Sequence, residues 1–322
     1  MTYTIEKVTT LIGARRYGDN DTNIGFILTD SRSLCFPEET LFFALKSERN
    51  DGHNYIPELY RRGVKNFVVT DVPKGYASDY PGANFLKVVN TLEALQRLAE
   101  RHRDEFNIPI VGITGSNGKT MVKEWLYQLL SPSMFVTRSP RSYNSQIGVP
   151  LSVWLMNEQT QVGVFEAGIS QPGEMLALRD IIQPTIAVLT NVGSAHQENF
   201  SSLEEKCREK LILFHDAETV VYDGDDELIT KVVAEYPDYK GEKLFWSLKN
   251  PEAPFYVKNI EKQQSVSVIT YIYKGEMDSF SIPFIDDASI QNSIISAVVA
   301  SKLGVSAEDI DKRMAKLEPV AM

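Results

Sequence analysis

Short apolar runs alternate with segments of helical periodicity along the middle of the chain. Between residues 109 and 223 these runs are almost wholly hydrophobic, which is typical of strands covered on both faces of a parallel sheet. The pattern predicts strands over 110–114, 162–166, 185–190 and 220–223. It predicts helices over 119–130, 174–181 and 203–215. This alternation indicates an α/β fold with a mostly parallel sheet flanked by helices.

The flanking parts of the chain follow different patterns. In the first hundred residues we predict strands over 24–29, 40–44 and 66–70, and helices over 56–62 and 91–103. Beyond the middle segment, alternating Tyr, Val and Ile over 245–283 predict strands at an antiparallel edge of the sheet, followed by helices over 289–303 and 309–317. We therefore expect a small α/β domain over 1–106 and a larger domain over 107–322.

Charge and composition exclude several classes of protein. Hydrophobic residues make up 43% and charged residues 24%, as in ordinary globular proteins. The net charge is −10, so we expect no nucleic-acid partner, and any phosphate must be held by a local device. Two distant cysteines, Cys35 and Cys207, indicate a reducing compartment. With no apolar run long enough for a signal peptide or membrane span, we expect a cytoplasmic protein without a membrane partner.

One segment between a predicted strand and a predicted helix is typical of a phosphate-binding loop. It consists of Gly115, Ser116, Asn117, Gly118, Lys119 and Thr120. Glycines let backbone N–H groups surround phosphate oxygens, the helix dipole and Lys119 favour the anion, and the Thr120 hydroxyl suits Mg²⁺. The common form has a glycine where Ile113 stands, so a glycine-rich turn that merely precedes Lys-Thr is the alternative.

The short loop form Thr-Gly-Ser-Asn-Gly-Lys-Thr resembles that of the Mur ligase family, the ATP-dependent amide-forming enzymes of peptidoglycan synthesis. The resemblance extends from about residue 24 to 322. It is greatest to the members that join D-alanyl-D-alanine to UDP-N-acetylmuramoyl-tripeptide through an acyl phosphate. It implies a small N-terminal UDP-sugar-binding domain, followed by a P-loop ATPase-type domain that uses ATP and two Mg²⁺ ions.

The same resemblance implies a metal site with Lys119 beside it as a catalytic residue. Thr120 and Glu166, which ends an apolar strand, would hold the first Mg²⁺. Glu166, His196 and Lys210, carbamylated by CO₂, would hold the second, since a carbamate is an anion where an ammonium would repel the metal. Taken alone, Glu166 could equally be a strand-end glutamate that faces water, and a lone histidine such as His196 is more often structural or solvated. Lys206 competes with Lys210, and both lie in a strongly charged helix.

Further residues match the family's substrate motifs. The resemblance assigns the UDP-linked substrate to Ser31, Arg32, Arg49, Asp51, Gly52, His53 and Asn144. It assigns the adenine to Asn292, although Ala288 and Ser289 stand where the family has a His-Asn pair. By themselves the N-terminal residues are equally typical of turns and helix caps.

The chain ends within Leu-Glu-Pro-Val, where the family continues into a C-terminal ligase domain. We therefore expect weak ligand binding and little ligation by these residues alone. A longer protein with a fused alanine racemase is compatible with this end. Three alternatives stay open: another Mur or folylpolyglutamate-type ligase, a P-loop kinase or NTPase, and a non-catalytic nucleotide-binding module.

Overall fold

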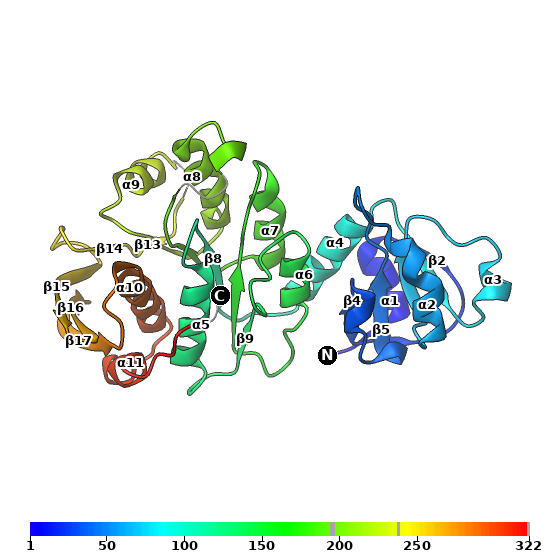
Figure 1. Ribbon diagram of the computed structural model, residues 1–322, viewed down its shortest axis with the longest axis horizontal. Helices are drawn as coiled ribbons and strands as arrows, with labels where there is room; N and C mark the ends of the chain where they lie inside the picture. The colour runs from blue at the N-terminus through cyan, green and yellow to red at the C-terminus, as the bar shows by residue number, and fades with distance from the viewer. Residues whose placement is uncertain (194–196, 237–238, 321–322) are drawn as a thin grey trace. The chain divides into compact units, whose positions relative to one another are not determined.

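The computed structural model describes residues 1–193, 197–236 and 239–320 (Figure 1). Contacts within the chain divide it into two compact units, Met1–Phe106 and Asn107–Met322. In the part of the chain that is described, no helix has the length and apolar character needed to cross a membrane.

The first unit is built on a five-stranded sheet with the order β2-β7-β6-β5-β4. β2 pairs antiparallel with β7, and the other neighbours are parallel. The strands are β2 (Arg15–Tyr17), β4 (Phe26–Leu28), β5 (Thr40–Phe43), β6 (Asn66–Val69) and β7 (Asn84–Lys87), with a separate pair β1 (Tyr3–Thr4) and β3 (Asn23–Ile24). The helices are α1 (Ile5–Ile12), α2 (Ile56–Arg61), α3 (Tyr76–Asp79) and α4 (Thr91–Arg103).

Aromatic side chains fill the core of this unit. Phe67 stacks on Phe85 with 5.3 Å between ring centroids, and Phe42 meets Phe67 edge to face. The strand predicted over 24–29 is divided in two, because Ile24 pairs with β1 whereas Phe26 begins the pairing of β4 with β5. The predicted helix over 91–103 is confirmed at both ends, and the Asn90 side chain caps it.

The second unit is built on a six-stranded sheet, all parallel, with the order β13-β12-β11-β8-β10-β9. The expected parallel sheet is therefore confirmed. Its strands are β8 (Ile110–Thr114), β9 (Val136–Arg138), β10 (Val162–Glu166), β11 (Ile186–Leu189), β12 (Thr219–Val221) and β13 (Glu242–Lys243). The chain reaches β9 and β10 on one side of β8 and then crosses to β11 on the other. Open α/β sheets bind ligands at such a switch point, beyond the carboxyl ends of the strands.

Helices cover this sheet and join it to a smaller one. They are α5 (Lys119–Leu130), α6 (Gly148–Val153), α7 (Glu174–Ile182), α8 (Leu203–Leu211), α9 (Glu227–Ala234), α10 (Asp287–Lys302) and α11 (Ala307–Met314). α10 lies beside α5 (Figure 1), and Ile294 and Val298 of α10 share a buried cluster with Trp125 and Leu129 of α5. The predicted helix over 203–215 is shorter than expected, since α8 ends at Leu211 and a 3-10 turn follows.

The strands predicted over 245–283 are confirmed and pair mostly antiparallel, but they do not lie at the edge of the parallel sheet. These residues form a separate four-stranded sheet in the order β14-β15-β16-β17, from β14 (Trp246–Ser247), β15 (Phe255–Gln263), β16 (Val266–Tyr273) and β17 (Glu276–Ile282). One isolated bridge, between Asp223 and Trp246, connects it to the end of β12. Its buried face, which includes Phe255, Ile269 and Phe280, belongs to the cluster that contains α10. A strand at the edge of the parallel sheet would not bury this face against that helix.

Candidate active site

The loop between β8 and α5 depends on two glycines with positive φ. Gly115 has φ 144° and Gly118 has φ 82°. A Cβ on Gly115 would lie 1.9 Å from Thr190 Oγ1, and one on Gly118 would lie 2.5 Å from Asn292 Oδ1. Both positions therefore require glycine for backbone conformation and for space.

Residues after β11 hold this loop in place. Asn191 accepts two hydrogen bonds from it, from Ser116 N to its carbonyl oxygen at 2.9 Å and from Asn117 N to its Oδ1 at 3.0 Å. The Thr190 hydroxyl donates to Asn117 O at 2.5 Å, and Gly193 N donates to Ser116 Oγ at 2.8 Å. The loop is thus fixed at the amino end of α5, where a helix dipole favours an anion.

Three lysines converge on carbonyl oxygens at this loop. Lys119 Nζ and Lys210 Nζ both donate to Gly115 O, at 2.9 and 3.2 Å, and Lys206 Nζ donates to Gly193 O at 2.5 Å. Burial, together with the charges of Lys119 and Lys206, lowers the pKa of Lys210 to about 7. Burial also lowers the pKa of Lys119 and of Lys206. With this pKa, Lys210 changes between an ammonium and a neutral amine near neutral pH.

A carboxylate and two hydroxyls meet beside the first turn of α5. The Thr120 hydroxyl donates to Glu166 Oε2 at 3.1 Å and lies 3.2 Å from Ser142 Oγ. Glu166 is fully buried, and its Oε1 accepts no hydrogen bond from any described residue, although Lys123 Nζ lies 3.0 Å away. Because Lys123 pairs with Oε1, the buried oxygen next to the Thr120 hydroxyl is Oε2, and that combination fits a hard cation such as Mg²⁺.

The structure thus brings Lys119, Thr120, Glu166 and Lys210 together around one loop. His196 lies outside the described residues. In the ranges that are described, no three His, Cys, Asp or Glu side chains are grouped as metal ligands.

Two predicted contact residues, Asn144 and Asn292, lie in the second unit. The Asn144 side chain packs against Gly168, where an added Cβ would be 2.9 Å from its Oδ1, and its carbonyl oxygen accepts a bond from Gly168 N. Asn292, on α10, lies against Gly118 and donates to Met121 Sδ at 3.2 Å. Asn292 therefore lies at the amino end of α5, whereas Asn144 lies beside the segment that follows Glu166.

Sequence reasoning missed Lys123. It lies on α5 one turn beyond Lys119, and its side chain is fully buried. A charged residue among the apolar positions of a predicted helix is a signal that could have identified it, because a buried lysine needs a partner.

In the first unit, a cavity of about 360 Å³ collects several of the predicted substrate residues. Its lining consists of Thr29, Asp30, Ser31, Arg32, Leu45, Asn50, Gly52 and Tyr55. Arg32 forms a bidentate ion pair with Asp30, from Nε to Oδ1 and from Nη2 to Oδ2, which lowers the pKa of Asp30 to about 2. Asn50 and Tyr55, which sequence reasoning did not select, bond to each other at 3.1 Å through the tyrosine hydroxyl.

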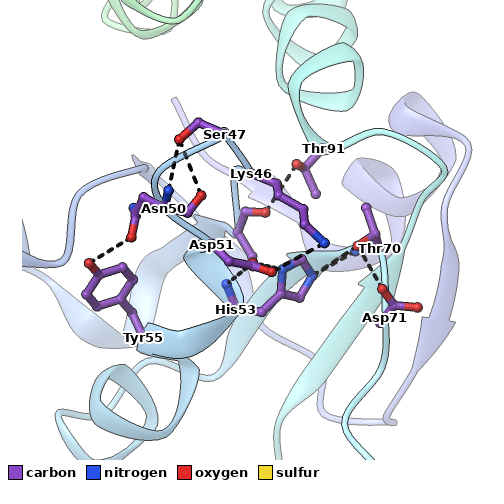
Figure 2. Close-up of polar contacts among 10 residues, drawn as sticks. Lys46, Ser47, Asn50, Asp51, His53, Tyr55, Thr70, Asp71 and Thr91 are labelled. Carbon is purple, nitrogen blue, oxygen red and sulfur yellow. Dashed lines mark hydrogen bonds and ion pairs between the residues drawn. The ribbon is translucent and has the colours of Figure 1, made fainter.

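Asp51 and His53 contact each other instead of lining this cavity. Figure 2 shows His53 between Asp51 and Thr70. Its Nε2 accepts the Thr70 N–H at 3.0 Å, so its Nδ1 carries the proton and donates to Asp51 Oδ1 at 2.6 Å. Bonds from the backbone and ring of His53 lower the pKa of Asp51. The pair fixes the loop that carries Gly52, whereas Arg49 is exposed and lies outside the cavity lining.

Comparison with known proteins identifies the family. Residues 113–300 match the Mur ligase middle domain, and residues 23–103 match the domain described as Mur ligase family, catalytic domain. The chain belongs to the Mur ligase family. The resemblance noted in the phosphate loop is therefore confirmed over more than half of the chain.

Similar proteins are named UDP-N-acetylmuramoyl-tripeptide–D-alanyl-D-alanine ligase. The one from Bacillus subtilis is 28% identical over 308 residues, which cover 94% of this chain and 64% of that protein. The one from Synechocystis is 34% identical over 236 residues, 71% of this chain and 50% of that protein. The chain thus spans less than two thirds of the length of these relatives.

Solved Mur ligase structures share the fold. MurF from Acinetobacter baumannii superposes with a TM-score of 0.89 at 24% identity, over 99% of this chain and 69% of that one. MurF ligase from Thermotoga maritima in complex with ADP superposes with a TM-score of 0.78 at 26% identity, over 96% of this chain and 67% of that one. The small N-terminal α/β unit and the parallel sheet flanked by helices are therefore those of a Mur ligase.

Proposed function

We propose that this chain is the UDP-substrate-binding and ATP-binding part of a ligase that joins D-alanyl-D-alanine to UDP-N-acetylmuramoyl-tripeptide in the cytoplasm. The observation that carries the proposal is the convergence of Lys119, Thr120, Glu166 and Lys210 on the loop between β8 and α5. The substrates in this proposal are those that the names of the similar ligases give.

The proposed reaction has two steps. The terminal carboxylate of the tripeptide attacks the γ-phosphorus of ATP, and ADP leaves, which gives an acyl phosphate. The amine of D-alanyl-D-alanine then attacks the acyl carbon, and phosphate leaves as the amide forms. Lys119 would orient the β- and γ-phosphates and stabilise the charge that develops on them, because phosphoryl transfer is catalysed chiefly by positioning and electrostatics.

Thr120 and Glu166 would hold a first Mg²⁺, and Glu166, His196 and Lys210 a second. When bound, Mg²⁺ neutralises phosphate charge and orients the reacting oxygens. The lowered pKa of Lys210 supports its proposed carbamylation. A neutral amine can attack the carbon of CO₂ and lose a proton, and the carbamate that forms is an anion suited to a cation.

We propose that the cavity of the first unit binds the UDP-linked substrate. Arg32 offers a guanidinium that Asp30 already orients, and Ser31 adds a hydroxyl, a combination suited to diphosphate oxygens. Asn50 and Tyr55 provide an amide and an aromatic ring at the same cavity. Asn144 would contact a phosphate or the substrate, and Asn292 would contact the adenine.

Calorimetric titration of the chain with ATP–Mg²⁺ and, separately, with UDP-N-acetylmuramoyl-tripeptide tests the proposal. We expect both to bind. Lys119→Ala should abolish only the ATP isotherm and Arg32→Ala only the UDP isotherm, with Arg61→Ala, an exposed arginine on α2, as the control.

The alternatives give different results. A P-loop kinase or NTPase would bind ATP and ignore the UDP ligand. A module whose ATP site has decayed would bind the UDP ligand and ignore ATP. Another ligase of the family would bind ATP but prefer a different acceptor, which titration with the tripeptide-linked nucleotide would expose.

A further inference from the structure

Lys123 joins three segments of the second unit through one buried ammonium group. Its Nζ lies 3.0 Å from Glu166 Oε1 at the end of β10 and 3.0 Å from Glu124 Oε1 on its own helix. It also donates to the carbonyl oxygen of Arg141, in the loop after β9. The side chain is fully buried, so water does not compete for these partners as it does at surface ion pairs.

The loop that Lys123 holds takes an unusual course at Arg141. This residue has φ 47°, in the left-handed region that residues with a Cβ adopt at a cost. The Arg141 side chain is exposed, so its packing does not account for the conformation. Two bonds hold this turn: Tyr143 N donates to Pro140 O at 3.1 Å, and Lys123 donates to the carbonyl oxygen of Arg141.

The turn at Arg141 places its neighbours beside the phosphate loop. Ser142 brings its hydroxyl to 3.2 Å from Thr120 Oγ1. Asn144 brings its backbone oxygen to Gly168 N at 2.8 Å, two residues beyond Glu166. Both contacts would be lost if the loop relaxed to an ordinary backbone conformation and moved away from α5.

Glu166 is held by the same arrangement. Its backbone N–H donates to Ser139 Oγ at 3.2 Å, and its Oε2 accepts from Thr120. Because the ammonium of Lys123 lies on the Oε1 side, the carboxylate keeps its other oxygen directed at the Thr120 hydroxyl.

We propose that Lys123 is a positioning residue for metal-bound nucleotide: it fixes the Glu166 carboxylate and, through Arg141, the loop that places Ser142 beside Thr120. The inference rests on the proposed binding of ATP–Mg²⁺. It assigns Lys123 no contact with substrate. The competing interpretation is a buried counter-ion that contributes only to the stability of the unit.

The test separates the metal-dependent part of nucleotide affinity from the rest. The dissociation constant of ATP is measured with excess Mg²⁺ and with a chelator, for wild type, Lys123→Met, Lys123→Gln and the exposed-lysine control Lys243→Met. We expect the strengthening by Mg²⁺ to fall at least about tenfold in both Lys123 variants. Affinity in chelator should stay within about twofold of wild type, and the control should be unchanged.

Other outcomes overturn the inference. Undiminished strengthening by Mg²⁺ would show that Lys123 does not position the site. A parallel loss of affinity in both buffers, or failure of both variants to fold, would make it a residue of stability alone. If wild type binds no ATP in either buffer, the proposed function itself fails, and that result differs from each of the others.

Discussion

Replacement of Lys210 by methionine should stabilise the second unit at low pH and lose this advantage at high pH. Burial and neighbouring charges lower the pKa of Lys210 from its usual 10.5 to about 7. At about 1.4 kcal/mol per pKa unit, protonation of this amine lowers the free energy of unfolding by up to about 5 kcal/mol. Methionine removes that cost but also the bond to Gly115 O, which contributes about 1 kcal/mol.

The sign of the pH dependence follows from proton linkage. Below pH 7 the folded and unfolded states both carry the proton, so the wild type bears the full cost. Between pH 7 and 10.5 the folded state releases the proton first, and wild-type stability rises relative to the variant. We therefore expect Lys210→Met to be more stable than wild type by about 2–4 kcal/mol at pH 6, and equal or slightly less stable at pH 10.

Urea unfolding followed by tryptophan fluorescence provides the assay. Trp125, Trp154 and Trp246 are all buried in the second unit, so the signal reports that unit. CO₂-free buffer is needed, and Lys243→Met is the matched control with no expected pH-dependent difference. A difference between variant and wild type that is constant from pH 6 to 10 would refute the lowered pKa. Added bicarbonate should then stabilise wild type alone and give a ¹³C carbamate signal, if Lys210 is carbamylated as proposed.

Three further changes have defined outcomes. Gly115→Ala should lower the free energy of unfolding by about 1–3 kcal/mol and abolish ATP binding, because the added Cβ would overlap Thr190 Oγ1. The control is Gly304→Ala, which is also at positive φ but has open space around it, and it should leave ATP binding intact. Arg141→Gly should raise the free energy of unfolding of the second unit by about 1 kcal/mol, because glycine adopts φ 47° without strain. A lower free energy of unfolding in this variant would contradict backbone strain at Arg141. His53→Ala should cost the first unit about 1–2 kcal/mol through its two lost hydrogen bonds, measured as faster amide hydrogen exchange in β6.

The elements that position the site follow closely from local sequence. The strand Ile110–Thr114 and the helix Lys119–Leu130 are found with the bounds that the pattern predicts, and glycines occupy the turn between them. Periodicity, turn chemistry and helix capping act over a few residues, so they can be read without knowledge of distant partners. The short strands β2, β7 and β9 were missed, because three or four residues give little periodicity.

The contacts between side chains from distant segments were decided only by the tertiary structure. Lys123 gives no sign in the sequence of its bonds to Glu166 and Arg141, since β9, β10 and α5 meet only when the sheet forms. Asp51 and His53 match a substrate motif, yet they bond to each other and to Thr70. The sequence determined the longer strands and helices of the second unit and the glycine-rich loop between β8 and α5. The fold determined which charged groups are buried together, because a buried charge is stabilised by partners that come from distant parts of the chain.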